Sequence, residues 1–318
     1  MNKKEMKFFE ALAKDRRESA NMLEKPSMKG IKGSVVEKYS DQAHFIYELL
    51  QNADDAGATD VHFKLSKSRL VFEHNGTRRF SISNPSREDK DAAEGTLGDI
   101  NAITAIANSS KEKESTIGKF GVGFKAVFQY TATPAIYDDN VWFKIERFIV
   151  PSLLEKDYVG RKPKTTVFVF PFDHPDKDAE HSVEEITQKL DSLVLPNLFL
   201  PNIKQISYEC INHSGKYKKD VEKTFDIEGI HIEKICMIQN LSRSIKKERL
   251  WVFSKPVGKD QVYAVGFFTD KKGKIVQKQY PAFCFFPTKV VTGLNFIIHA
   301  PFLLTDSREG IRENSIFL

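Results

Sequence analysis

The sequence predicts two α/β domains in series, the first of them an α/β sandwich. The chain has 318 residues, which is long for one compact domain and comfortable for two. An amphipathic helical pattern followed by short alternating strands predicts the first domain. A polar stretch at 172–182 then reads as a linker, and a helix with several strands follows it. We therefore expect domains at residues 1–175 and 176–318.

Each element has its own pattern. The first 35 residues read as helical and then irregular, and apolar residues recur at helical spacing from about 40 to 56, where Gly57 is placed to end the helix. A shorter periodic piece lies at 100–107. Strands of the first domain are expected at 61–66, 69–75, 141–150 and 165–172. In the second domain we expect a helix at 183–195 and strands at 249–255, 262–270 and 294–304.

Composition limits the class of protein. The 41% hydrophobic and 29% charged residues are typical of a soluble globular protein, and no apolar run approaches the roughly 18 residues of a membrane span. The charged N-terminus lacks the apolar stretch of a signal peptide, so we expect a cytoplasmic protein without a membrane partner. The net charge of +5 and the short basic runs support nucleic-acid binding only weakly. Three widely spaced cysteines predict neither a disulfide framework nor a zinc site.

The first motif is ELLQNADDAGA. Glu48, Asn52 and Asp55 stand at positions i, i+4 and i+7, which share one face of a helix. An amide oxygen is a hard ligand suited to Mg²⁺, and a carboxylate one turn earlier is placed to orient or deprotonate a water. Any surface helix also has a polar face, so the stripe alone does not establish a site.

The second motif is IGKFGVGFKAVF. Gly118, Gly121 and Gly123 precede a helical run at 124–130, and such glycines let a backbone approach phosphates at a helix N-terminus. The motif lacks the Gly-Lys-Ser/Thr ending of a Walker A loop and the preceding strand of a Rossmann fold. The polar segment 85–117, which ends in these glycines, looks like a mobile lid.

Together the two motifs resemble the GHKL superfamily, whose members bind ATP in the Bergerat fold. The motif sequences are most similar to those of the sacsin-type branch, which is related to the ninety-kilodalton heat-shock chaperones. This resemblance implies a Bergerat-type sandwich followed by a smaller α/β middle, transducer-like domain. It also implies binding of ATP with Mg²⁺ and slow hydrolysis of ATP.

The resemblance assigns roles by position. Glu48 matches the general base, Asn52 the magnesium ligand and Asp55 the acid near the nucleotide. Thr166 matches the threonine near the adenine. The lid segment that touches sugar and phosphate corresponds to Ser109, Ser110 and Lys111. The phosphate-binding end of the lid corresponds to Gly118, Lys119, Phe120, Gly121, Val122, Gly123 and Phe124.

One stretch departs from the family pattern. An Asp followed by a glycine usually receives the adenine amino group, but here the stretch reads FEHNG. His74 or Asn75 therefore stands where the Asp is expected, followed by Gly76. An Asn oxygen accepts a hydrogen bond from an amine, and a neutral His accepts one through a single ring nitrogen. The same three residues also suit a simple turn between strands.

The resemblance extends into the second domain, over PAFCFFPTKVVTGLNFIIHAPFLLTDSREGI. Ser307, Arg308 and Glu309 resemble the chaperone segment that supplies a catalytic arginine to the γ-phosphate. A surface arginine in a capped turn is the alternative interpretation.

The leading hypothesis is an ATPase switch, the N-terminal module of a larger chaperone-like or bacterial antiviral defence protein. It implies ATP-dependent homodimerisation and an effector domain or partner protein elsewhere. One alternative is an ATP-gated nucleic-acid clamp resembling MutL or MORC proteins. Another is a nucleotide sensor that does not hydrolyse ATP.

Overall fold

The computed structural model describes residues 1–28, 30, 44–106, 122–241, 244–258, 261–305 and 310–312. It is a mixed α/β structure with two compact units. The first unit comprises Met1–Leu190 with Glu209–Ile211, and the second Asp191–Tyr208 with Asn212–Leu318. The chain therefore changes unit at residues 190–191, at the end of helix α6, whereas the sequence interpretation places the boundary before that helix.

Helix α6 (Ala179–Asp191) belongs with the first unit because of its side-chain contacts there. The Tyr130 hydroxyl donates to Glu185 at 2.7 Å, and the Lys177 ammonium pairs with the same carboxylate. Lys177 also lies over the Tyr130 ring, 4.3 Å from its centroid. The helix begins and ends four residues earlier than the expected 183–195.

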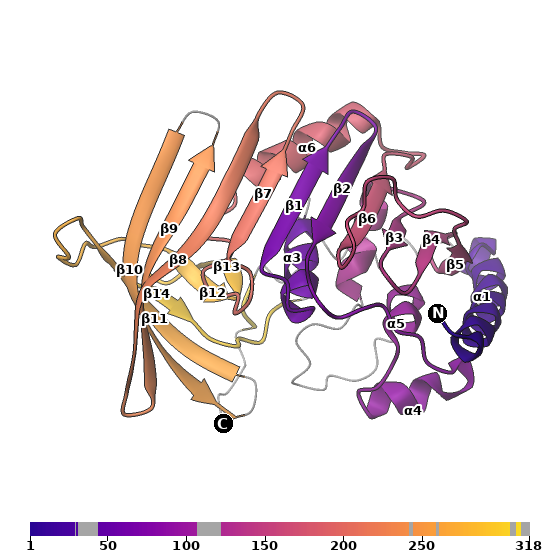
Figure 1. Ribbon diagram of the computed structural model, residues 1–318, viewed down its shortest axis with the longest axis horizontal. Helices are drawn as coiled ribbons and strands as arrows, with labels where there is room; N and C mark the ends of the chain where they lie inside the picture. The colour runs from indigo at the N-terminus through magenta and orange to yellow at the C-terminus, as the bar shows by residue number, and fades with distance from the viewer. Residues whose placement is uncertain are drawn as a thin grey trace. The chain divides into compact units, whose positions relative to one another are not determined.

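The strands that the structure describes in the first unit run antiparallel in the order β1-β2-β6-β3-β4-β5 (Figure 1). The expected strand at 141–150 is two strands, because Arg147 and Phe148 adopt left-handed φ angles of 49° and 75° and reverse the chain. The bounds are β1 Asp60–Leu65, β2 Arg69–His74, β3 Ala135–Tyr137, β4 Trp142–Glu146, β5 Val150–Leu153 and β6 Thr166–Pro171.

Helix α3 (Phe45–Asp55) and the 3₁₀ helix η3 (Val122–Gln129) lie on one face of this sheet. Phe168 and Phe170 of β6 both contact the Phe124 ring of η3, and Phe170 contacts Phe45 of α3. Alternate residues of the same strand face the other way, into a cluster with Val71. Residues Thr166, Phe168 and Phe170 therefore share the helix-covered face.

Helix α3 ends as the sequence predicts. Gly57 follows it with a φ of +75°, the left-handed conformation that stops a helix and that glycine adopts without strain. The expected start near residue 40 lies outside the described residues, and the described helix begins at Phe45. Helix α1 (Lys3–Leu23) occupies the N-terminal segment, with Asn2 as its capping residue.

The first part of the expected lid is folded. It contains η2 (Pro85–Arg87), α4 (Glu88–Ala93) and α5 (Asp99–Thr104). The buried Asn101 amide accepts from the Ser83 N–H at 2.9 Å and donates to Glu88 at 2.8 Å. These bonds hold the segment in place, whereas residues 107–117 of the expected lid lie outside the described part of the chain.

The strands of the second unit run in the order β13-β12-β14-β11-β10-β9-β8-β7 (Figure 1). The expected strands fall within or overlap β10, β11 and β14, but β7, β8, β9, β12 and β13 were not predicted. Strand bounds are β7 Gln205–Glu209, β8 Ser214–Ile227, β9 Ile230–Leu241, β10 Ser244–Val257, β11 Gln261–Thr269, β12 Pro281–Cys284, β13 Phe286–Val291 and β14 Ile297–His299.

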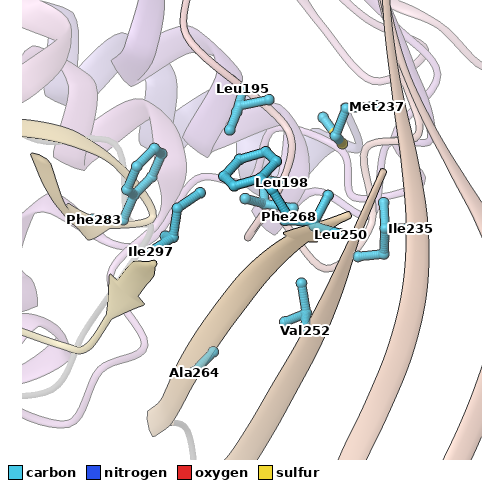
Figure 2. Packing of buried hydrophobic residues seen from close by; sticks show 10 residues of the cluster. All are labelled: Leu195, Leu198, Ile235, Met237, Leu250, Val252, Ala264, Phe268, Phe283 and Ile297. Atoms are coloured by element: carbon cyan, nitrogen blue, oxygen red, sulfur yellow. The ribbon is translucent and has the colours of Figure 1, made fainter. Parts of the chain in front are cut away.

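An apolar cluster forms the core of the second unit (Figure 2). Its side chains come from the strands and from the loop that follows α6, and all of them are buried. The cluster consists of Leu195, Leu198, Ile235, Met237, Leu250, Val252, Ala264, Phe268, Phe283 and Ile297.

Candidate functional site

The Glu48 carboxylate lies directly against the backbone of Gly123. Glu48 projects from α3 into the interior and is 6% exposed. A Cβ added at Gly123 would stand 1.8 Å from Glu48 Oε2, so a residue with any side chain would displace the acid. His44 Nε2 lies 3.9 Å from Glu48 Oε1, one helical turn earlier. Sequence reasoning missed this histidine, although its i, i+4 spacing to Glu48 was visible.

Asn52 follows Glu48 by one helical turn and is also 6% exposed. Its side-chain amide makes no hydrogen bond to any residue that the structure describes. Asp55 is the last residue of the same helix and is half-buried. The structure therefore brings the acid and the amide of the first motif together on the covered side of the sheet.

His74 ends strand β2 and is 4% exposed. Its Nδ1 accepts a hydrogen bond from the Gly76 N–H at 3.1 Å. Burial, together with the nearby Arg79 and Arg78 charges, lowers the pKa of His74 to about 3. The ring is therefore neutral at physiological pH. Because Nδ1 is an acceptor, the ring proton resides on Nε2.

Thr166 lies directly across the strand pair from His74, in register on β6. Cross-strand partners of this kind have their side chains on the same face, a few ångströms apart. Thr166 is 1% exposed, and its hydroxyl has no hydrogen-bond partner among the described residues. A buried hydroxyl and a buried ring nitrogen therefore stand side by side.

Asn75 has a different role from its neighbour. Its Oδ1 accepts from the Thr59 and Asp60 N–H groups at 2.9 and 3.0 Å, and its Nδ2 donates to the Thr59 hydroxyl. These bonds fix the start of β1 and leave Asn75 exposed. Of the two residues that the sequence left open, His74 is the one in the interior.

Gly76 joins the end of β2 to the end of α3. A Cβ at this position would stand 2.8 Å from the Ala56 carbonyl oxygen, so glycine permits the close approach. The Thr77 N–H donates to the same carbonyl at 2.8 Å. The His74 end of the sheet is thereby held against the last turn of α3, which follows Asn52.

Helix η3 is anchored by a buried lysine. Lys125 donates to the Phe148 carbonyl at 2.9 Å and lies 4.8 Å from the centroid of the Phe148 ring. Burial lowers the pKa of Lys125 to about 7. This contact holds the helix that carries Gly123 and Phe124, the latter packed in the aromatic core.

Several expected site residues lie outside the described part of the chain, and their roles stay predictions. These residues are Ser109, Ser110, Lys111, Gly118, Lys119, Phe120, Gly121, Ser307, Arg308 and Glu309. Val122 lies within the described part and begins η3.

Two features are absent from the part of the chain that the structure describes. Within this part, no group of three His, Cys, Asp or Glu side chains is placed to hold a metal ion. No described helix is both long enough and apolar enough to cross a lipid bilayer.

Known proteins share features with this chain. Residues 25–145 match the model of the Sacsin domain family. The chain is 26% identical to Protein NO VEIN of Arabidopsis thaliana over 316 residues, which covers 88% of this chain and 11% of that protein. It is 30% identical to human Sacsin over 108 residues, which covers 33% of this chain and 2% of Sacsin.

The chain thus spans about a tenth or less of each relative. The family match includes Glu48, Asn52, His74 and Gly123, whereas Thr166 lies beyond it. These matches support the sacsin-type resemblance of the N-terminal region.

Proposed function

We propose that this chain binds ATP with Mg²⁺ on the helix-covered face of its first sheet and hydrolyses it slowly. One observation carries the proposal: polar groups on this face have no hydrogen-bond partner among the described residues. The Thr166 hydroxyl is buried without a partner there, and no hydrogen bond within the described part of the chain engages the Asn52 amide or His74 Nε2. Buried polar groups are normally satisfied, and those left over point to a bound ligand.

The sacsin-type match supports a nucleotide as that ligand. It covers the helix with Glu48 and Asn52 and the glycine-rich segment that the resemblance assigns to phosphate binding. His74 and Thr166 lie at the end of the sheet, where the resemblance places the base. The site therefore has groups for both ends of a nucleoside triphosphate.

Asn52 fits a magnesium ligand in this arrangement. Mg²⁺ prefers oxygen and usually takes one or two protein ligands together with substrate phosphates and waters. A single amide oxygen is consistent with the lack of a three-residue ligand cluster among the described residues. When bound, the ion neutralises charge on the phosphates.

Glu48 is the proposed base for hydrolysis. Its carboxylate takes a proton from a water, the water oxygen bonds to the γ-phosphorus, and the bond from that phosphorus to the β–γ bridging oxygen breaks. Contact with the Gly123 backbone fixes the acid. Arg308, outside the described residues, is proposed to meet the charge on the transferred group. Turnover is slow because this assembly must form first.

At the level of the whole protein, we propose a module of a larger chaperone-like or defence protein that closes on ATP and dimerises. The short coverage of both relatives agrees with a module of this kind. The effector or client lies with other parts of such a protein.

The test compares wild type with Glu48→Ala by calorimetry and by phosphate release, each with Mg²⁺ and ATP. We expect ATP binding in both proteins and a loss of turnover of about 100-fold or more in the variant, because Glu48 acts on water and not on ATP. Glu155→Ala, at an exposed position, is the matched control and should turn over at the wild-type rate.

Equal turnover in Glu48→Ala and wild type would refute Glu48 as the base. Binding without turnover in either protein would favour a sensor. Absence of ATP binding in wild type would refute the proposal.

A further inference from the structure

His74 faces the proposed nucleotide site as a hydrogen-bond donor. The Gly76 N–H occupies the lone pair of Nδ1 at 3.1 Å, so the single proton of the neutral ring is on Nε2. No described residue hydrogen-bonds Nε2, although His74 is only 4% exposed. The side chain therefore has one available group, an N–H.

The surroundings of His74 disfavour the other tautomer and the doubly protonated ring. If the proton moved to Nδ1, two N–H groups would face each other across the 3.1 Å contact with Gly76. Double protonation is opposed by burial and by the charges of Arg79 and Arg78. His74 thus does not accept a hydrogen bond from an amino group, as the expected Asp would.

Thr166 supplies the second group. Its hydroxyl lies across the strand pair from His74, has no partner among the described residues, and is able to donate or accept. A base edge meeting this pair makes two adjacent contacts. The group against His74 must be an acceptor, whereas the group against Thr166 is of either kind.

Purine edges differ in how well they meet this condition. Guanine and hypoxanthine present two adjacent acceptors, O6 and N7, so they fit the pair in either order. Adenine presents an N6 amino donor between the N7 and N1 acceptors, so it fits only when one of these ring nitrogens, and not N6, meets His74.

We infer that the base site of this chain donates to the nucleotide base, so that a 6-oxo purine nucleotide binds at least as tightly as ATP. The inference rests on the proposed nucleotide site and adds the class of base that it takes.

The first experiment measures the dissociation constants of ATP, ITP, GTP and CTP for the 318-residue chain by calorimetry with Mg²⁺. ITP and ATP give the sharpest comparison because they differ at position 6 of the purine. We expect ITP and GTP to bind as tightly as ATP or more tightly, and CTP to bind about tenfold more weakly.

Three results would overturn the inference, and they differ in what else they refute. ATP binding tenfold tighter than ITP and GTP would leave the proposed function standing and refute the donor site. Equal affinity for all four nucleotides would mean that the protein does not recognise the base, which would refute the donor site. Binding of none would refute the nucleotide site itself.

A variant sharpens the test. His74→Asp places an acceptor next to Arg78 and Arg79, and it should shift the ratio of ATP to ITP affinity toward ATP by about tenfold. His62→Asp, on neighbouring strand β1, is the matched control and should leave the ratio unchanged. An unchanged ratio in folded His74→Asp would overturn the inference, and the wild-type panel decides if that variant does not fold.

Discussion

Each unit of the molecule contains a buried histidine with the same local hydrogen bond and different surroundings. His74 accepts from the Gly76 N–H, and His299 in the second unit accepts from the Phe285 N–H at 3.2 Å, each through Nδ1. Burial lowers the pKa of both rings, to about 3 for His74 and about 4 for His299.

The surroundings separate their roles. His299 stacks on Phe199 with a ring separation of 4.5 Å and an angle of 13°, and it meets the edge of Phe285. His74 packs less closely against rings, 5.9 Å from Phe72 and 6.1 Å from Phe168, and it lies across from the Thr166 hydroxyl, which has no partner among the described residues. A buried histidine that already has a backbone bond is therefore structural or functional according to what surrounds the rest of its ring.

The same contrast holds for the two cores. The cluster of the second unit is entirely apolar (Figure 2). The covered face of the first sheet mixes aromatic rings with Glu48, Asn52 and Thr166. An apolar core needs no hydrogen-bond partner, whereas the Thr166 hydroxyl has none among the described residues, and the proposed ligand would supply one.

The chain offers a separate probe for each unit. It contains two tryptophans, Trp142 in β4 of the first unit and Trp251 in β10 of the second. Trp251→Phe leaves a reporter in the first unit, and Trp142→Phe leaves one in the second. The comparison between the units is therefore testable by fluorescence.

The largest effect on stability is expected from Leu250→Ala. Leu250 is fully buried in the apolar cluster, and such truncations lower the free energy of unfolding by about 2–5 kcal/mol. The urea midpoint followed by Trp251 fluorescence should fall, whereas the midpoint followed by Trp142 fluorescence should not change. The affinity for ATP should also stay unchanged. Equal shifts at both tryptophans would mean that the units unfold together and that the contrast fails.

Acidification should destabilise both units by a smaller amount. The unfolded histidines bind a proton near pH 6.5, whereas folded His74 and His299 do so only near pH 3 and 4. The free energy of unfolding therefore decreases as pH falls below about 6.5. By pH 5 the decrease is on the order of 1–2 kcal/mol per ring. Unfolding at pH 7 and pH 5 in each single-tryptophan protein measures this loss.

A variant isolates the contribution of one ring. His299→Gln keeps an acceptor for the Phe285 N–H but does not titrate. The free energy of unfolding followed by Trp251 fluorescence should depend less steeply on pH in this variant. The pH dependence followed by Trp142 fluorescence should remain the same. An unchanged slope at Trp251 would contradict the assignment.

The smallest effect on stability is expected from Thr166→Val. The hydroxyl has no partner among the described residues, so its loss should change the free energy of unfolding by less than about 1 kcal/mol. Nucleotide affinity should fall by about tenfold, for ATP and ITP alike. Strong destabilisation of the first unit, followed by Trp142 fluorescence, would show that the Thr166 hydroxyl stabilises the fold. Thr166 would then no longer be a candidate ligand-binding residue.

Local patterns predicted much of the first unit. The helical stripe with Glu48 and Asn52, the stop at Gly57 and most of the strands follow from spacing alone. The turn at 147–148 was missed because its apolar residues continue the strand pattern, and left-handed φ angles at Arg147 and Phe148 carry no sequence signal. Strand β8 was missed because its outer half is exposed and charged residues interrupt its apolar positions.

The proposed base site could be assigned only with tertiary information. The sequence could not choose between His74 and Asn75, because the choice depends on Thr59 holding Asn75 and on β6 placing Thr166 across from His74. Which ring nitrogen carries the proton depends on the Gly76 N–H.

The contact between Glu48 and Gly123 also has a consequence for protein engineering. A methyl group at 123 and the Glu48 carboxylate in its present place cannot share the space that the 1.8 Å separation defines. A substitution at 123 therefore displaces the acid even when Glu48 itself is kept. A designed library has to treat the two positions as one unit.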